Sequence, residues 1–401
     1  MTSLREGWRE VMLGDFAEVT VGHVGSMASE YVDDGVVFLR SQNVVPHGFD
    51  LSDVKCIPAE FHSRLRKSAL SAGDVVTVRT GSPGATAVVP KEWDSANCSD
   101  LVITRPGSEI DSYWLSYYIN SVATGFVNSM LVGAVQQHFN VGAARSMVLE
   151  LPPIHEQRAI AAVLGALDDK IAANRKLAAS AEALLAAELQ ALHFDQDVDG
   201  GDSRILTDYF DLNPACPRIA VPEPVYVDMQ KLPTSSMMIE DWESRPSKGG
   251  ARFMNGDTLL ARITPCLQNR KTGYVDFLGD DEVAIGSTEY IVIRAKPGVP
   301  RELSYFLATS ERFRTFAVRH MVGTSGRQRL SANDLTGYQV RAVDPAALNR
   351  WGAIAGPLVE QLGVARDESR TLAATRDALL PRLMSGELRV RDAERQVEEV
   401  L

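Results

Sequence analysis

The chain has 401 residues, of which 45% are hydrophobic and 23% are charged. This balance is typical of a soluble folded protein, and the length favours two domains over a single core. The formal net charge of -11 argues against a protein that binds nucleic acid over its whole surface, because phosphate contacts need clustered Lys and Arg.

Neither a membrane span nor a secretory leader is expected from the sequence. No run of about 18 uncharged apolar residues occurs, and the first ten residues, MTSLREGWRE, carry charge where a signal peptide is apolar. We therefore expect a cytoplasmic protein. The cysteines form no CxxC pair, which favours reduced thiols over a zinc site or a disulfide framework. They are Cys56, Cys98, Cys216 and Cys266.

The first part of the chain, residues 1–152, has the pattern of a mixed globular domain. Runs of β-branched residues bounded by Gly and Pro predict strands at 75–78 and 101–103. A helix is expected over 114–119. Together these elements predict an α+β domain of about 150 residues.

A long helix is expected after Pro152 and Pro153, in the segment 153–196. Apolar or small residues recur there at alternating spacings of four and three, which is typical of a coiled-coil seam. They are Ile160, Leu164, Leu167, Ile171, Ala178, Ala181, Leu185 and Leu192. Asn174 adds a polar seam position, which can fix the register of a helix pair. Such a helix would be roughly 50 Å long, so it needs a second helix to cover its apolar stripe.

The rest of the chain repeats this plan. Residues 197–345 form a second mixed segment, with a strand expected at 290–293 and a helix at 303–307. Residues 346–401 form a second helical segment, which we expect Pro381 to interrupt and Gly386 to end.

Three pairs of segments match along the sequence in the same order. They are 73–79 with 256–262 (GDVVTVR and GDTLLAR), 115–118 with 303–306 (LSYY and LSYF), and 175–185 with 370–380 (RKLAASAEALL and RTLAATRDALL). We predict an α+β fold with two globular domains in a pseudo-twofold arrangement, separated by two long antiparallel coiled-coil helices. Because duplex DNA has a local dyad, two similar domains related in this way suit two separated half-sites.

Several segments resemble the specificity subunit of type I restriction-modification systems, a phage-defence system. The resemblance covers nearly the whole chain in order. The segments that carry it are 7–15 (GWREVMLGD), 38–43 (FLRSQN), 73–74 (GD), 151–160 (LPPIHEQRAI), 167–171 (LDDKI), 253–260 (FMNGDTLL), 323–329 (GTSGRQR) and 380–388 (LPRLMSGEL). One departure is that the Pro-Pro-x-x-Glu-Gln motif before the first helix is degraded to DPAALN at 344–349 before the second.

The resemblance implies two target-recognition domains, each of which reads half of a bipartite site in double-stranded DNA. It implies that the helices space these domains and dock two methyltransferase subunits and, through them, restriction/translocase subunits. It implies no cofactor in this chain, and S-adenosylmethionine, ATP and magnesium in the partner subunits.

The sequence offers no convincing catalytic motif. GxxxxGK[ST] and GxGxxG are both missing from it. Asn213-Pro214-Ala215-Cys216 lacks the second proline and the aromatic residue of an adenine-methyltransferase motif, and His155-Glu156 lacks the second histidine of a metalloprotease helix. We therefore expect a noncatalytic chain that binds no metal.

Candidate DNA contacts follow from base-edge chemistry, in which Arg pairs with guanine and Asn or Gln with adenine. Four clusters hold such residues: Arg327, Gln328 and Arg329; Gln268, Asn269, Arg270 and Lys271; Gln136, Gln137 and His138; and Arg40, Gln42 and Asn43. The first and third occupy equivalent places in the two repeats.

Some of these segments have a structural alternative. Residues 40–43 also suit a buried turn whose amide groups bond the backbone, and 73–74 and 256–257 suit structural turns. The arginines between 312 and 329 also suit a solvated helix face. For the whole chain, the acidic charge leaves open a coiled-coil scaffold with protein-binding heads, and an enzyme is the third possibility.

Overall fold

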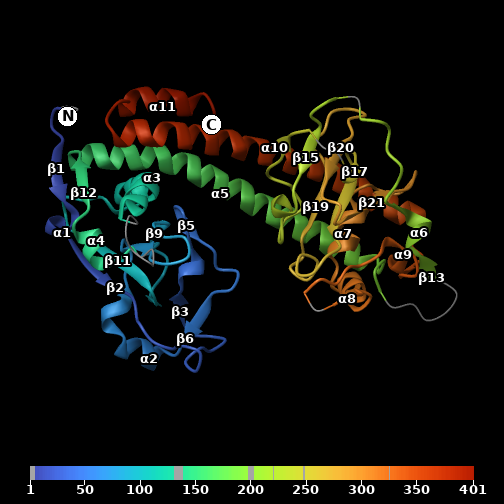
Figure 1. Cartoon of the computed structure of the whole chain (residues 1–401), viewed down its shortest axis with the longest axis horizontal. Coiled ribbons are helices and arrows are strands. Elements are labelled where there is room, and N and C mark those ends of the chain that lie inside the picture. Colours follow the sequence, from blue (N-terminus) through green and yellow to red (C-terminus); the bar gives the residue numbers. More distant parts are fainter. Residues whose placement is uncertain (1–4, 131–138, 197–202, 220, 247–248, 325) are drawn as a thin grey trace. The chain divides into compact units, whose positions relative to one another are not determined.

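A computed structural model describes residues 5–130, 139–196, 203–219, 221–246, 249–324 and 326–401. The chain divides into two compact units, of which unit 1 comprises 1–170 and 371–401, and unit 2 comprises 171–370. Each unit contains one globule of strands and short helices together with part of both long helices (Figure 1). The boundaries expected from the sequence, 1–152, 153–196, 197–345 and 346–401, stay predictions.

The globule of unit 1 is built on two four-stranded sheets. The first has the order β2-β11-β8-β9 and is antiparallel throughout, whereas the second has the order β6-β3-β10-β7 and pairs β3 with β10 in parallel. The strands are β2 (Ala17–Val21), β3 (Val36–Leu39), β6 (Lys55–Ile57), β7 (Ala69–Leu70), β8 (Val75–Val78), β9 (Thr86–Val88), β10 (Ala96–Cys98) and β11 (Leu101–Pro106).

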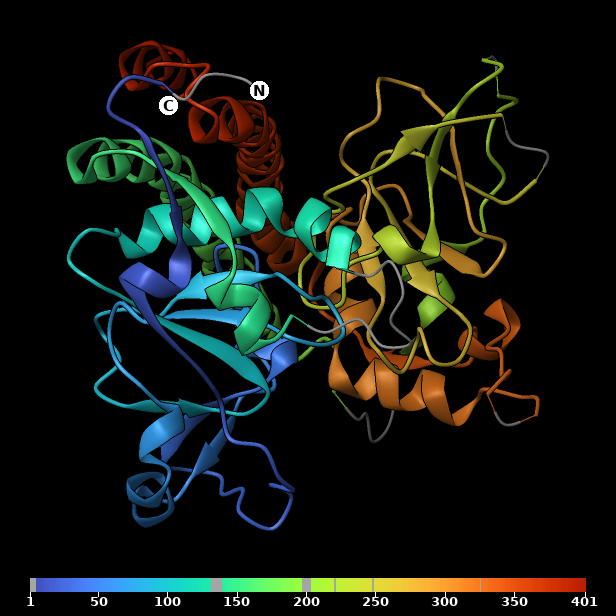
Figure 2. The ribbon, with the colours of Figure 1, turned by 60° about the vertical axis from the view of Figure 1, so that its left-hand side comes forward.

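Burial explains why these runs form strands. Every residue of β8 and the first four of β11 are buried, which suits their near-continuous apolar and β-branched sequence. Helix α3 (Ser112–Met130) packs on β8 and β9 (Figure 2). Its Trp114 is completely buried. The remaining elements are α1 (Leu13–Phe16), η1 (Ser41–Asn43), β4 (Val44–Val45), β5 (Gly48–Phe49), α2 (Ala59–Arg64), η2 (Arg66–Ser68) and α4 (Val141–Arg145).

Unit 2 has the same topology. Its sheets have the orders β14-β21-β18-β19 and β16-β15-β20-β17, so each strand has a counterpart in unit 1 at the same place in the sheet. The strands are β14 (Phe210–Leu212), β15 (Val225–Val227), β16 (Glu243–Ser244), β17 (Ala251–Phe253), β18 (Asp257–Ala261), β19 (Thr272–Tyr274), β20 (Ala284–Gly286) and β21 (Tyr290–Ala295). The helices are α6 (Leu206–Tyr209), η3 (Met229–Lys231), α7 (Leu303–Thr309), α8 (Glu311–Arg319) and α9 (Ala332–Leu335).

The first and last strands of each globule pair with each other. In unit 1, β1 (Arg9–Met12) is antiparallel to β12 (Val148–Leu151), and in unit 2, β13 (Ser203–Ile205) is antiparallel to β22 (Gln339–Arg341). The sequence repeat is therefore a repeat of a complete fold. The mixed α and β architecture predicted from the sequence is confirmed.

The long helices are α5 (Ile154–Ala191) and α10 (Pro345–Met384), and a short α11 (Val390–Glu398) follows. The seam expected on α5 is buried at Ile160, Leu164, Leu167, Ile171, Ala181 and Leu185. In unit 2, Asn174 donates to Ala365 O (3.2 Å) and Trp351 Nε1 donates to Leu185 O (3.1 Å). Residue numbers rise along α5 as they fall along α10, so the two helices are antiparallel there.

The Glu-Gln motif at the start of α5 has a structural role. Gln157 is completely buried, and its Oε1 accepts a hydrogen bond from Asp111 N (2.8 Å). Its Nε2 donates to Glu109 O (2.9 Å) and Pro152 O (2.8 Å). The amide thus joins the start of the helix to the loop before α3.

The degraded motif before α10 is replaced by apolar packing. Pro345 is the first residue of that helix, where its missing N–H costs nothing, and Leu348 and Trp351 are buried. The expected interruption at Pro381 is wrong, because α10 continues to Met384. Pro381 lies exposed in the last turns, so solvent can satisfy the carbonyl that loses its partner. Gly386, with φ of 69°, lies just beyond the end, as expected.

Among the helices of the described ranges, none is long and apolar enough to cross a membrane.

Candidate nucleic-acid interface

In unit 2, two loops form one continuous surface beyond the end of β18. Thr264 N donates to Gln328 O (3.0 Å) and Leu330 N donates to Arg262 O (2.8 Å). These bonds join the loop 262–271 to the segment 326–330. The structure therefore places two of the predicted clusters, 268–271 and 327–329, on loops that are bonded to each other.

Helix α8 adds basic side chains to this surface. Arg314 Nη1 donates to Gln268 O (3.2 Å), and Glu311 pairs with both Arg270 (3.3 Å) and Arg314 (3.2 Å). A hollow of about 150 Å³ opens beside Arg314. It is lined by Thr234, Ser235, Ser236, Leu260, Leu267, Arg270, Thr272, Tyr305, Ala308, Thr309 and Arg314. Hydroxyl and guanidinium groups therefore line this hollow, and both are donors suited to an anion.

The two arginines of the 327–329 cluster have different surroundings. Arg329 Nε donates to both carboxylate oxygens of Glu289 (2.9 and 3.0 Å), and its Nη2 lies 2.9 Å from Oε1. Arg327 is exposed, and no carboxylate among the described residues pairs with it. Arg327 is thus the arginine of the pair that is free to meet a new acceptor.

Asn269 is exposed, whereas the side chain of Lys271 is engaged. Lys271 Nζ donates to Met229 O (2.7 Å) and Gln230 O (3.2 Å), which holds the end of the loop against η3. Within this cluster, Gln268 and Asn269 are therefore better placed than Lys271 to contact a ligand.

The cluster at 40–43 forms a hydrogen-bonded turn. Asn43 is 1% exposed, accepts from Arg40 N (3.1 Å) and donates to Asp50 O (2.9 Å), which favours the structural alternative for this residue. Arg40 and Gln42 both donate to Asp53 Oδ2, at 3.0 and 3.1 Å. Lys55 and then Arg40 lower the pKa of Asp53 to about 2.

The remaining cluster, Gln136, Gln137 and His138, lies outside the described residues. The residue that follows it in sequence, Phe139, donates from its backbone N to Arg79 O (3.2 Å). This bond corresponds to the one from Leu330 N to Arg262 O in the other repeat. None of the predicted contacts is tested by these observations, so all of them stay predictions.

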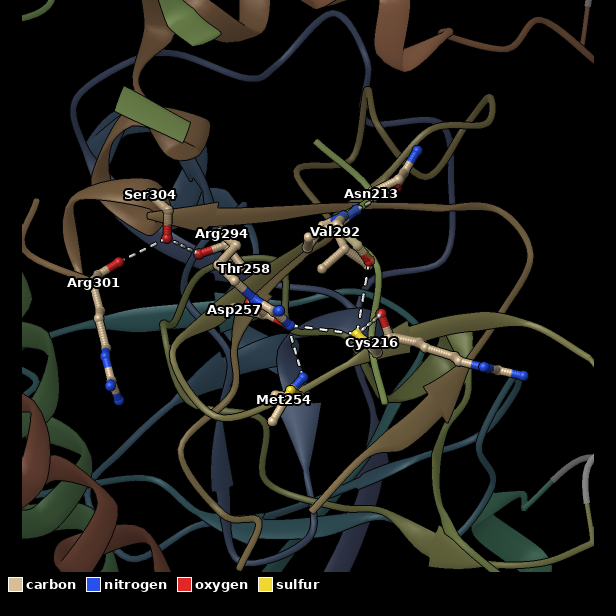
Figure 3. A network of polar contacts seen from close by, with 11 residues as sticks. Asn213, Cys216, Met254, Asp257, Thr258, Val292, Arg294, Arg301 and Ser304 are labelled. Atoms are coloured by element: carbon tan, nitrogen blue, oxygen red, sulfur yellow. Dashed lines mark hydrogen bonds and ion pairs between the residues drawn. The ribbon is translucent and has the colours of Figure 1, made fainter. Parts of the chain in front are cut away.

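The Gly-Asp turns are structural in both units. Asp257 is completely buried, accepts from Met254 N (2.7 Å) and forms a two-pronged pair with Arg294, both bonds being 2.6 Å (Figure 3). Burial raises the pKa of Asp257 despite this partner. In unit 1, Asp74 likewise accepts from Ser71 N (3.0 Å) and lies 3.5 Å from the guanidinium of Arg105.

The Asn-Pro-Ala-Cys segment belongs to the same network (Figure 3). Asn213 Oδ1 accepts from Val292 N (3.0 Å), and Cys216 Sγ accepts from Arg294 Nη2 (3.4 Å). These side chains hold the segment onto β21. Within the described ranges, no three His, Cys, Asp or Glu side chains gather as metal ligands.

Three solved structures resemble this chain over nearly its whole length. The type I restriction-modification system S subunit from M. genitalium has a TM-score of 0.55 at 14% identity, covering 96% of this chain and 97% of that one. A chain from work on "complex assembly and conformational transition of the type I R-M system" has a TM-score of 0.39 at 16% identity, with coverage of 97% and 100%. The HsdS subunit from Thermoanaerobacter tengcongensis has a TM-score of 0.35 at 14% identity, with coverage of 96% and 98%.

The first of these comparisons defines the fold, which this chain shares with an S subunit. No protein-family model matches the chain. No curated protein matches it either.

Proposed function

We propose that this chain is the noncatalytic DNA-specificity subunit of a type I restriction-modification complex. The observation that carries the proposal is the repeated globule, with the same strand order in both units, in a chain that has the fold of an S subunit. The motifs that resemble the same family support it independently, because they come from the sequence and not from the fold.

In this proposal each globule is a target-recognition domain that reads one half of a bipartite duplex site. Two copies of one topology suit the local dyad of DNA, and different loops on the copies suit an asymmetric target. The loop surface made by 262–271 and 326–330 would be the reading surface of unit 2, since it combines exposed Arg, Gln and Asn side chains.

The same proposal assigns partners to the helices. We propose that they dock two methyltransferase subunits, which in turn recruit restriction/translocase subunits, and that S-adenosylmethionine, ATP and magnesium belong to these partners. In support, Leu177 and Leu184 lie one heptad apart on α5 and are 52% and 51% exposed, as a helix face that binds another protein would be. The complex would act in the cytoplasm.

The test is to express the chain with its modification subunit in a host that lacks adenine methylation and to map methylated adenines. We expect methylation within a single bipartite sequence, and none when either protein is expressed alone. Methylation by this chain alone would show an enzyme. If the complete pair leaves all adenines unmodified and the chain does not bind duplex DNA at low salt, a protein-binding scaffold is the better description.

A further inference from the structure

A pair formed by an arginine and a carboxylate occupies the same position in both repeats. In unit 1, Arg79 Nη1 lies 2.9 Å from Asp100 Oδ1. In unit 2, Arg262 Nε lies 3.5 Å from Glu289 Oε2. Each arginine directly follows the matching strand, β8 or β18, and each carboxylate directly precedes β11 or β21. Both pairs are therefore built at the same end of the same two neighbouring strands.

At this end of the sheet, each arginine is bonded to a residue that follows a predicted DNA-contact cluster in the sequence. The backbone carbonyl of Arg79 accepts from Phe139 N, and that of Arg262 accepts from Leu330 N. Phe139 and Leu330 immediately follow the equivalent predicted clusters, 136–138 and 327–329. Each arginine is thus bonded through its carbonyl to the residue that follows a predicted cluster in the sequence.

Both arginines are partly open and incompletely bonded. Their side chains are 22% exposed for Arg79 and 32% for Arg262. The Nε of each is shielded from solvent and has no hydrogen-bond partner among the described residues. Because this nitrogen is shielded, the terminal nitrogens of each partly exposed guanidinium are the donors that can reach a new acceptor.

Both carboxylates are held by a second donor. Thr80 Oγ1 donates to Asp100 Oδ2 (2.8 Å), and Arg329 bonds both oxygens of Glu289. Asp100 has φ of 54°, a left-handed conformation that short polar residues tolerate. A fixed carboxylate fixes the orientation of its arginine, and orientation is what base recognition requires.

We infer that Arg79 and Arg262 each read a guanine, one in each half-site, with Asp100 and Glu289 as their positioning residues. This inference rests on the proposed function. The guanidinium fork matches the O6 and N7 acceptors of guanine. In unit 1 the pair of Arg79 and Asp100 carries almost no net charge, so it is a poor anchor for a phosphate, whose attraction is electrostatic. In unit 2 Arg262 shares Glu289 with Arg329, so the salt dependence of binding is what separates base reading from phosphate binding there.

The structure supplies a matched control at the opposite end of the same strands. Arg105 pairs with Asp74 and with Glu18, and Arg294 pairs with the fully buried Asp257. Their side chains are 29% and 26% exposed, close to the values for Arg79 and Arg262. These two arginines hold Gly-Asp turns, so they differ from the proposed readers in position and not in residue type or exposure.

The experiment compares Arg79→Lys, Arg262→Lys, Arg105→Lys and Arg294→Lys in the full chain, expressed with its modification subunit. Lysine keeps the charge but loses the fork. We expect Arg79→Lys to lose the preference for one G·C pair in one half-site, and Arg262→Lys to do so in the other half only. In selection from duplexes with randomised base pairs, the loss of discrimination should be about tenfold to hundredfold. The control variants should keep the wild-type motif.

The salt dependence separates base reading from phosphate binding. We expect the slope of log K against log salt to be nearly unchanged in the charge-removing variants Arg79→Gln and Arg262→Gln, whereas loss of a phosphate contact would lower it by about one. A uniform loss of affinity for all sequences would overturn the inference, as would an unchanged motif in both lysine variants. If either lysine variant fails to fold, Asp100→Asn and Glu289→Gln retain the arginine without its ionic partner. They should weaken the same base preferences, and retention of those preferences would also overturn it. Absence of any bipartite motif with the wild-type chain would refute the proposed function itself.

Discussion

The surroundings of His47 in unit 1 predict that low pH destabilises the fold. The imidazole stacks on Tyr117, with ring centroids 4.5 Å apart, and its Nδ1 lies 3.2 Å from Asn120 Nδ2. Thr86 N donates to Asn120 Oδ1 (3.1 Å), which fixes the orientation of this amide. Because the amide presents a donor to His47, Nδ1 must accept, and only the neutral ring can do so.

The stability effect follows from the pKa. Burial lowers the pKa of His47 from 6.5 to about 4. Between these values the unfolded chain binds a proton that the folded chain does not, so the free energy of unfolding rises with pH across this window. The stability that neutral His47 contributes is fully present above about pH 6.5 and is lost as the pH falls to 4. A full shift would be worth about 3 kcal/mol, and partial solvent exposure of the ring reduces this to about 1–2 kcal/mol.

The measurement is urea unfolding of the wild type and of His47→Asn from pH 4 to 7.5. Asparagine tolerates the left-handed backbone at this position, where φ is 65°, and does not titrate. Other titrating groups cancel in the difference between the two proteins. We expect that difference to shrink as the pH falls below 6.5. A difference that stays constant over the whole range would refute the neutral, buried imidazole.

Three further substitutions test other parts of the structure. Arg327→Ala should cost about 1–3 kcal/mol at one base of one half-site in competition binding, since this exposed side chain is free to read a base; an unchanged motif would remove it from the interface. Asn174→Ala should lower the free energy of unfolding in urea by about 1–2 kcal/mol, because the buried Asn174 donates a hydrogen bond to α10. Ser180→Ala, at an exposed position of the same helix, is the control. Gln157→Leu should cost about 2–3 kcal/mol in the same assay, because it leaves three backbone groups unpaired, and a neutral result would contradict the role assigned to the motif.

Elements whose pattern is local were predictable from the sequence. The expected strands at 75–78, 101–103 and 290–293 lie in β8, β11 and β21, and the expected helices at 114–119 and 303–307 lie in α3 and α7. Pro381 was misleading because a proline costs least where solvent can replace the lost bond, and exposure is not visible in a single sequence.

The candidate site was harder to predict because its contacts join distant parts of the chain. Arg329 and Glu289 are 40 residues apart in sequence, and nothing local indicates that they pair. Arg79 and Arg262 also pair with carboxylates that are distant in sequence. Neither lies in a cluster of Arg, Asn and Gln residues, so neither was among the predicted DNA contacts. One signal was present, since both arginines end the matched segments 73–79 and 256–262, and a position retained in two otherwise divergent copies has a shared role.

Because the first and last strands of each globule pair with each other, each globule can be replaced as a unit. The chain enters the globule of unit 1 along β1 and leaves it along β12, which is hydrogen-bonded to β1. It enters and leaves the globule of unit 2 along the paired strands β13 and β22. A segment whose two ends lie side by side can be replaced by another of the same topology without altering what precedes or follows it. Under the proposed function, recombination between related genes at these strand pairs would yield a new target sequence in a single step, without altering the long helices.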